Sequence, residues 1–215
     1  MRTATETMIP TGQVQLAADI VAPTNATGVV LFAHGSGSSR FSPRNRAVAE
    51  TLNQHDLATV LVDLLTPSEE EIDVQTARLR FDIAFLADRL TGIVDWLATA
   101  RQIPKLPIGL FGSSTGAAAA LVAAAERPDT VRAVVSRGGR PDLAGAALGK
   151  VRAATLLLVG GNDEQVIPLN EEARQKLTGA TTELRVIPGA THLFEEPGAL
   201  EQVADQAAGW FRAHL

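Results

Sequence analysis

The sequence predicts an α/β protein in which a mostly parallel central sheet of about eight strands is flanked by helices. Short and almost continuous apolar runs, such as Gly28–Ala33 and Thr155–Val159, are typical of strands that are buried on both faces. Longer stretches with helical periodicity separate these runs. Because strand and helix alternate along most of the chain, successive strands are expected to lie parallel in one sheet.

The first part of the chain predicts an antiparallel hairpin. Apolar and polar residues alternate in Thr3–Met8 and Val14–Val21, around the turn residues Pro10-Thr11-Gly12. After the strand at Gly28–Ala33, Ser42-Pro43 supplies a capping residue and a first-turn proline, which predicts a helix over Arg44–His55.

The middle and the end of the chain continue the alternation. A buried strand is expected at Ala58–Leu64, and helical periodicity then extends over Asp73–Ala100, with an irregularity expected near Thr91-Gly92. An apolar strand ending in Ile108–Phe111 is followed by an alanine-rich helix to about Glu126. The remaining predicted elements are strands at Val131–Val135, Thr155–Val159 and Leu184–Ile187, and a last helix from about Gly198 to the end.

Composition excludes several classes of protein. The 215 residues suffice for one core, so we expect a single domain over residues 1–215. A net charge of −5 argues against nucleic-acid binding, and the absence of cysteine excludes disulfides, thiolate metal sites and a cysteine nucleophile. Met1–Pro10 does not resemble a signal peptide, and no apolar run is long enough to span a membrane. We therefore expect a cytoplasmic protein without membrane contact.

Gly112-Ser113-Ser114-Thr115-Gly116 stands between a predicted strand and a predicted helix. Gly-x-Ser-x-Gly in this context is typical of a nucleophile elbow, a sharp turn that holds a serine in strained geometry. The small residues on each side of Ser114 let the strand and the helix approach each other. Ser113 is the weaker candidate, because Phe111 and Thr115 would occupy its small positions. An ordinary Gly/Ser turn is the alternative interpretation of the motif.

Polar residues at the ends of two later strands supply a base and an acid. Ligand sites in such sheets lie beyond the carboxyl ends of the strands, where Asp163 and His192 are expected. With Ser114 they give the order Ser, Asp, His that serine hydrolases with an elbow use. Asp142 remains the second choice for the acid, while Asp63 precedes the serine and breaks the order.

The loop that begins at His34 predicts an oxyanion hole. His34-Gly35-Ser36-Gly37 follows an early strand, as does the segment that lends a backbone N–H to the oxyanion in such enzymes. We expect the N–H groups of Ser36 and Thr115 to be the two donors. A nucleotide fingerprint is disfavoured, because Arg40 stands where its third glycine belongs. Zinc-binding and phosphate-loop motifs are absent from the sequence, and no metal or organic cofactor is expected.

These segments, together with Gly161–Pro168 and Gly189–Phe194, resemble α/β-hydrolases of the dienelactone-hydrolase-like group. The resemblance covers nearly the whole chain and is strongest to lid-less modules that also occur fused to phosphoribosyltransferases. It implies the α/β-hydrolase fold. Only Ser136–Ala154 separates two strands where a lid could be inserted, which predicts an open site without a large cap domain. Dienelactone hydrolases proper use a cysteine nucleophile, so the serine here favours simple ester chemistry.

The resulting functional prediction is a serine hydrolase that cleaves small-molecule carboxylic esters through an acyl-enzyme. An acyltransferase or perhydrolase that uses the same three residues is one alternative, and a non-catalytic binding or regulatory module is another.

Arg40 and Arg137 stand near the predicted site and are candidates for binding an anionic group of the substrate. The alternative for Arg40 is a solvated surface arginine, and the alternative for Arg137 is a structural arginine that ties its loop to a neighbouring carboxylate. The sequence makes no prediction about the oligomeric state.

Overall fold

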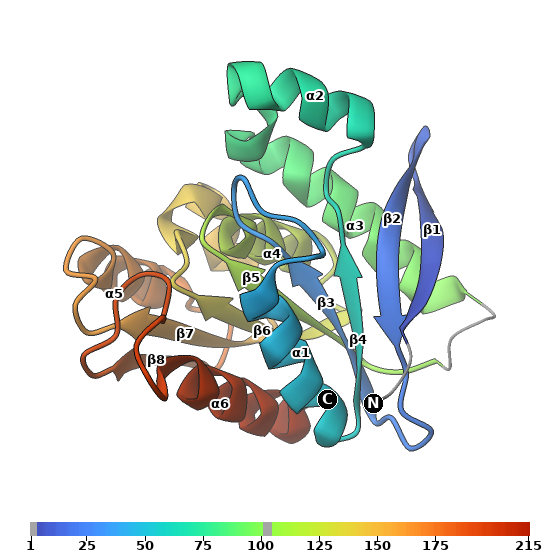
Figure 1. Ribbon diagram of the computed structural model, residues 1–215. Coiled ribbons are helices and arrows are strands. Elements are labelled where there is room, and N and C mark those ends of the chain that lie inside the picture. The colour runs from blue at the N-terminus through green and yellow to red at the C-terminus, as the bar shows by residue number, and fades with distance from the viewer. Residues whose placement is uncertain (1–3, 101–104) are drawn as a thin grey trace.

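The computed structural model describes residues 4–100 and 105–215, and in it eight strands form one twisted sheet. The strand order is β1-β2-β4-β3-β5-β6-β7-β8. Strands β3 to β8 run parallel, whereas β2 pairs antiparallel with both β1 and β4 (Figure 1). The predicted α/β fold with an antiparallel N-terminal hairpin is thus confirmed. The strands are β1 (Thr5–Thr11), β2 (Val14–Val21), β3 (Gly28–Ala33), β4 (Leu57–Val62), β5 (Ile108–Ser113), β6 (Val131–Arg137), β7 (Ala154–Gly160) and β8 (Thr182–Ile187).

Helices cover both faces of the sheet. On one face lie α1 (Pro43–Gln54) and α6 (Ala199–His214), and on the other lie α3 (Ile83–Thr99) and α4 (Thr115–Glu126), as Figure 1 shows. The helix α5 (Ile167–Lys176) packs beside the 3-10 segment η2 (Pro141–Lys150) on the α4 side. Only η2 stands between β6 and β7, so no large cap domain is inserted there, as predicted.

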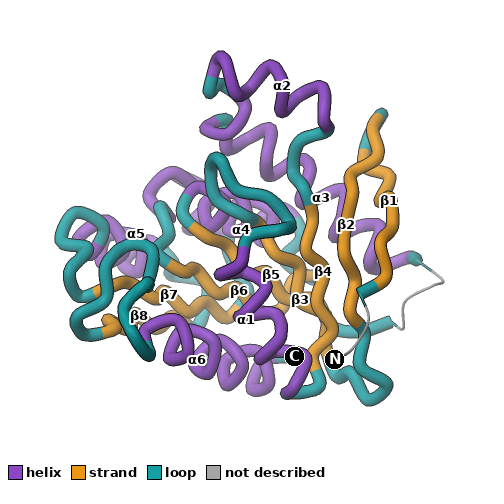
Figure 2. The backbone as a smooth tube through the Cα atoms, in the orientation of Figure 1, coloured by secondary structure: helices purple, strands orange, loops and turns teal. Residues whose placement is uncertain are grey.

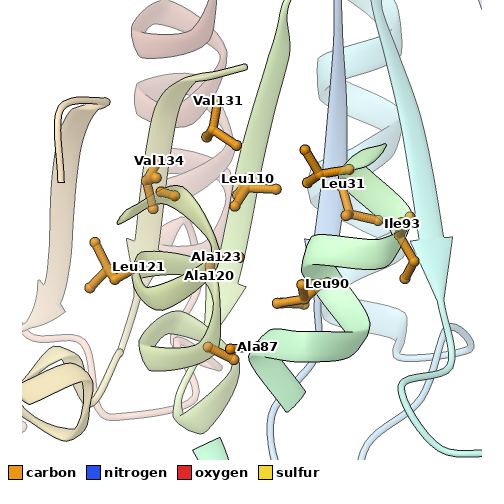
Figure 3. Close-up of a cluster of buried hydrophobic side chains, with 14 of the residues drawn as sticks. Leu31, Ala87, Leu90, Ile93, Leu110, Ala120, Leu121, Ala123, Val131 and Val134 are labelled. Carbon is orange, nitrogen blue, oxygen red and sulfur yellow. The ribbon is translucent and has the colours of Figure 1, made fainter. Parts of the chain in front are cut away.

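Apolar side chains form one core layer on each side of the sheet. In the layer shown in Figure 3, Leu110 lies between the alanines of α4 and the leucine and isoleucine side chains of α3. Only 4% of the residues are aromatic, so small and aliphatic side chains fill this space. The run Ala117–Ala120 is fully buried, and its short side chains allow α4 to lie close to the sheet directly after β5.

The parallel strands bring distant segments of the chain to one edge of the sheet. The loops after β3, β5, β7 and β8 all leave from the carboxyl ends of parallel strands and therefore lie at the same edge. Figure 2 shows how these loops connect the strands to the surrounding helices. The segments that carry Ser36, Ser114, Asp163 and His192 are among them.

The prediction of one helix over Asp73–Ala100 is wrong, because the chain breaks well before Thr91-Gly92. The segment divides into α2 (Pro67–Thr76), the 3-10 turn η1 (Leu79–Phe81) and α3. Ala77 has a φ of 52°, which ends α2, and Asp82 caps the start of α3 by accepting a hydrogen bond from the Phe85 N–H. α3 continues through Gly92 without interruption. This glycine faces Thr11, whose Oγ1 would lie only 2.0 Å from an added Cβ. Gly92 thus serves close packing and does not interrupt the helix.

The Asp73 side chain stabilises the segment between α2 and α3. Its carboxylate is fully buried and accepts hydrogen bonds from the backbone N–H groups of Leu79 and Arg80 and, at 2.5 Å, from Arg80 Nε. Burial alone would raise the pKa of Asp73, but the Arg80 side chain and the two N–H groups outweigh it and lower the pKa. The segment between α2 and α3 is therefore tied to an ionised carboxylate.

Replacing Asp73 with asparagine is expected to lower the free energy of unfolding at neutral pH by about 2 kcal/mol, because a buried, charge-assisted network is broken. The lowered pKa means that this stabilisation is present above the pKa of aspartate in the unfolded chain and is lost as the pH falls through the folded value. Urea unfolding of both proteins at neutral and acidic pH measures the difference. If the difference in unfolding free energy between the two proteins stayed constant from neutral to acidic pH, the role given to the carboxylate would be contradicted.

The hairpin turn lies slightly later than predicted. Pro10 and Thr11 belong to β1, where Pro10 is paired with Gln15, and the turn is made by Gly12 and Gln13. An edge strand tolerates proline, since its outer side has no hydrogen-bonding partner strand. Thr3, the predicted start of this strand, lies outside the described residues. Within the described part of the chain, every helix is too short or too polar to cross a membrane.

Candidate active site

Ser114 occupies a strained turn between β5 and α4. Its φ of 51° and ψ of −122° are unusual for a residue with a side chain, and such conformations cost about 1–3 kcal/mol. The surrounding backbone holds this geometry. The Ser114 N–H donates to Arg137 O at 3.3 Å, and Ser114 O accepts from the N–H groups of Ala117 and Arg140, each at 3.1 Å. The turn is thus fixed from α4 and from the segment after β6.

The two glycines of the motif allow the turn to close. A Cβ on Gly112 would lie 2.4 Å from the Ala117 Cα, and a Cβ on Gly116 would lie 2.3 Å from the Ala33 carbonyl oxygen. Both distances are far below a van der Waals contact. Gly112 therefore lets α4 fold back on β5, and Gly116 lets α4 pack against the end of β3.

The adjacent serine has a different environment. Ser113 is buried, and its Oγ donates to Asn45 Oδ1 on α1 at 3.2 Å. Ser114 is only half-buried, and its Oγ makes no hydrogen bond to another described residue. The geometry therefore favours Ser114 over Ser113 as the nucleophile.

His192 and Asp163 form a close pair beyond the ends of β8 and β7. The distance from His192 Nδ1 to Asp163 Oδ2 is 2.6 Å. The Asp163 side chain is 11% exposed and that of His192 is 39% exposed. An ionised carboxylate at Nδ1 favours the tautomer in which Nδ1 carries the proton, which leaves Nε2 free as an acceptor. The pair can therefore act as an oriented base.

Asp142, the alternative acid, is engaged elsewhere. Its carboxylate accepts two hydrogen bonds from Arg140, with Nε–Oδ1 and Nη2–Oδ2 distances of 2.9 and 2.8 Å. This fork ties together two residues of the connection between β6 and η2. The structure thus pairs His192 with Asp163 and places Asp142 in a local ion pair.

Ser114 and His192 both lie close to the backbone at Arg137 and Gly138. Ser114 bonds to the Arg137 carbonyl, while a Cβ on Gly138 would lie 2.9 Å from His192 O and 3.6 Å from His192 Cε1. No hydrogen bond joins Ser114 Oγ to His192 in residues 4–100 and 105–215. Such catalytic hydrogen bonds are often long in the absence of substrate and shorten when it binds.

The two predicted oxyanion donors are neighbours. The Ser36 N–H donates to Thr115 Oγ1 at 3.2 Å, which brings the loop after β3 against the first residue of α4. The Thr115 N–H lies at the start of α4, where backbone N–H groups have no partner within the helix. The two predicted donors thus lie next to each other, and the Ser36 N–H is hydrogen-bonded to the Thr115 hydroxyl.

His34 supports this loop. Its Nε2 accepts a hydrogen bond from the Leu64 N–H at 3.1 Å, and its Nδ1 lies 2.9 Å from Gly35 O. Burial lowers the pKa of His34. Because Nε2 accepts a hydrogen bond from a backbone N–H, the ring is neutral and carries its proton on Nδ1. The histidine thus ties the end of β3 to the segment after β4 and is not a second base.

The family model described as "Dienelactone hydrolase family" matches residues 16–213. The chain belongs to the dienelactone hydrolase family.

Two solved structures illustrate what the chain is similar to. A crystal structure described as a dienelactone hydrolase from Anabaena variabilis is 57% identical, with a TM-score of 0.98 over 100% of this chain and 99% of that one. Est1E from Butyrivibrio proteoclasticus has the same fold at 17% identity, with a TM-score of 0.78 over 97% and 98% of the two chains.

Two curated relatives from Mycobacterium tuberculosis strains, each named a putative phosphoribosyl transferase, are 55% identical over 98% of this chain. The chain spans about half the length of these relatives, since the match covers 46% of each.

Arg40, one of the two predicted substrate-binding residues, lies within a cluster of carboxylates. Its guanidinium is 2.8 Å from Glu6, 3.5 Å from Asp19 and 3.3 Å from Asp63, and its side chain is only 10% exposed. Burial acts to lower the pKa of Arg40, but the three carboxylates outweigh it and raise the pKa. This geometry connects the loop before α1 to β1, β2 and the end of β4 through ion pairs, which the sequence did not indicate for Arg40.

Arg137 lies at the end of β6 and is 7% exposed. In contrast to Arg40, it makes no ion pair or side-chain hydrogen bond with any described residue, and its Nε is shielded from solvent without a partner. Burial, with a contribution from the positive charge of Arg44, lowers the pKa of Arg137 to about 10. It therefore remains charged at neutral pH.

Three features of the site were not anticipated from the sequence. These are the Ser113–Asn45 bond, the Thr115 hydroxyl that receives the Ser36 N–H, and the Arg44–Glu195 ion pair of 3.1 Å beside Phe194. Each depends on side chains from distant segments, so no local sequence motif predicts it. Among the described residues, no cluster of His, Asp and Glu side chains is suited to hold a metal ion.

Proposed function

We propose that this member of the dienelactone hydrolase family is a serine hydrolase that cleaves carboxylic esters of small molecules. The observation that carries the proposal is the 2.6 Å pair of His192 and Asp163 at the sheet edge where Ser114 occupies its strained turn. The chain contains no cysteine, so the thiol chemistry of other hydrolases is not available to it. Ser114 is the residue that this arrangement is suited to activate.

The proposed reaction has two steps. His192 Nε2 takes the proton from Ser114 Oγ as the serine attacks the acyl carbon, and Asp163 orients the imidazole and stabilises its charged form. The N–H groups of Thr115 and Ser36 stabilise the oxyanion. His192 then gives the proton to the leaving alcohol, and water hydrolyses the acyl-enzyme with the same residues.

A fluorophosphonate probe combined with a panel of p-nitrophenyl esters tests the proposal. We expect covalent labelling at Ser114, identified by peptide mass spectrometry, and hydrolysis that the Ser114→Ala variant lacks. Labelling together with preferential transfer to added alcohols or peroxide would instead establish an acyltransferase or perhydrolase. Absence of both labelling and turnover would point to a binding module.

Thr115→Val tests the oxyanion site separately. The substitution removes the acceptor of the Ser36 N–H and nearly keeps the shape of the side chain. We expect kcat to fall about tenfold with little change in KM, because the bond that positions one oxyanion donor is lost. Steady-state kinetics measure the effect, and Thr115→Ser, which keeps the hydroxyl, is the matched control. An increase in kcat would show that the hydroxyl competes with the oxyanion for this donor.

A further inference from the structure

A buried side chain of α5 connects the segments that hold Ser114 and Asp163. Asn170 is fully buried, and its side-chain nitrogen Nδ2 donates hydrogen bonds to Gly139 O at 3.1 Å and to Val166 O at 2.9 Å. Both acceptors are backbone carbonyls, so the NH2 half of the amide is the half that suits them. Gly139 belongs to the segment after β6, and Val166 belongs to the loop after β7. One side chain therefore bridges two loops of the candidate active site.

The segment after β6 holds the nucleophile turn in place. The Ser114 N–H donates to Arg137 O at 3.3 Å, and Ser114 O accepts from the Arg140 N–H at 3.1 Å. Gly139 lies between these two residues, and a Cβ on it would lie only 2.7 Å from the Ala117 Cβ of α4. Because the segment packs this tightly, a shift of the Gly139 carbonyl would move the Ser114 backbone with it.

Val166 holds the turn that carries the acid. The Val166 N–H donates to Asp163 O at 3.0 Å, and Val166 O accepts from the backbone N–H of Asn170 at 3.1 Å as well as from its Nδ2. The Asp163 carboxylate contacts His192 Nδ1 at 2.6 Å. Among the side-chain hydrogen bonds of residues 4–100 and 105–215, that of Asn170 Nδ2 is the one that joins α5 to the segment after β6.

The Asn170 amide is only partly satisfied, which argues against a purely structural role. Its Oδ1 is shielded from solvent and makes no hydrogen bond within the described part of the chain. An unpaired polar atom in the interior destabilises the folded state, and an apolar side chain of similar size would avoid this cost. An apolar side chain could not hold the Gly139 carbonyl, however. The position of that carbonyl therefore explains the asparagine better than stability does.

We propose that Asn170 is a positioning residue that sets the distance between Ser114 and the His192–Asp163 pair. Its side-chain bonds go to backbone carbonyls, so it acts through the two loops and not on the substrate. A misplacement of about 1 Å in a catalytic group can lower a rate by about 10²-fold. This inference rests on the proposed hydrolase function and adds a residue that no motif of the sequence predicts.

The variants Asn170→Leu and Asn170→Ala test the proposal with p-nitrophenyl esters and the fluorophosphonate probe. Leucine nearly keeps the volume of the side chain and removes its donors, whereas alanine also leaves a cavity. We expect kcat to fall about 10- to 100-fold in both variants with little change in KM, and the rate of Ser114 labelling to fall by a similar factor, because attack by the serine depends on the distance. If kcat measured well below the Tm stays at the wild-type value in both variants, or falls only in Asn170→Ala, the hydrogen bonds do not position the serine and the proposal is wrong.

Asn53 supplies the matched control. It is also a buried asparagine, and its Nδ2 donates to Leu57 O at 2.9 Å and to Thr59 Oγ1 at 3.0 Å. Leu57 begins β4, so this amide lies toward the amino-end edge of the sheet, opposite the candidate site. We expect Asn53→Ala to lower the Tm and to leave kcat unchanged. If it lowered kcat as much as Asn170→Ala does, loss of stability would explain both effects and the positioning role would be refuted.

The pH dependence of labelling separates the distance to Ser114 from the contact between Asp163 and His192. The Asn170 variants keep that contact, so the midpoint of the pH–rate profile should match that of the wild type while the plateau rate is lower. A shifted midpoint would show that the substitutions disturb the base and its acid instead, and it would overturn the proposal. Failure of the hydrolase proposal is recognised separately, because the wild type itself would then neither be labelled at Ser114 nor hydrolyse any ester.

Discussion

Replacing Ser114 with alanine is expected to lower kcat for ester hydrolysis about 10⁶-fold, because the serine and His192 act as one unit and the residual rate comes only from binding and the oxyanion site. The fold should be unaffected. The Ser114 side chain makes no hydrogen bond to another described residue, and alanine keeps the Cβ in the same strained turn. Measured kcat and Tm of the purified variant, with contaminating esterases excluded, provide the test.

The neighbouring serine supplies the matched control. Ser113→Ala removes a buried hydroxyl that bonds to Asn45, so we expect some loss of stability while hydrolysis continues. The two substitutions are chemically identical and one residue apart. If Ser113→Ala abolished activity and Ser114→Ala did not, the nucleophile assignment would be reversed.

The candidate site was largely predictable because it depends on local motifs and on sheet topology. Gly112–Gly116 specifies a strand-to-helix turn by its small residues, and parallel strands bring their carboxyl ends to one edge regardless of sequence distance. The pairing of Asp163 with His192 follows once both are placed at that edge. The pairing of Asp142 with Arg140 could not be predicted, because the segment that carries both residues has no periodicity from which their side-chain directions could be inferred.

The errors have a common physical origin. Helical periodicity continues from Asp73 to Ala100, and only the hydrogen bonds of the Asp73 carboxylate and the positive φ of Ala77 reveal that the helix is broken. In the same way, Arg40 and Arg137 look alike in the sequence. They differ because β1, β2 and the end of β4 surround Arg40 with carboxylates, whereas the segments around Arg137 bring Phe194 and Arg44. Periodicity reports one face of one element and carries no information on such partners.

Replacing Asp163 with asparagine is expected to lower kcat about 10⁴-fold, because the amide keeps the shape of the side chain but stabilises the wrong tautomer of the imidazole. An amide nitrogen donates to His192 Nδ1, which moves the ring proton to Nε2 and removes the acceptor for the serine proton. The turn itself should persist, since the Asp163 carbonyl accepts the Val166 N–H at 3.0 Å through the main chain. Steady-state kinetics and the rate of fluorophosphonate labelling at Ser114 should decline together.

Asp142→Asn is the matched control for Asp163→Asn. The same chemical change there breaks the fork to Arg140, which is only partly buried, so a small loss of stability and little loss of kcat are expected. A larger fall in kcat for Asp142→Asn than for Asp163→Asn would show that a different carboxylate orients the base. Equal and modest effects would mean that His192 works without a carboxylate partner, and the 2.6 Å contact would then be structural.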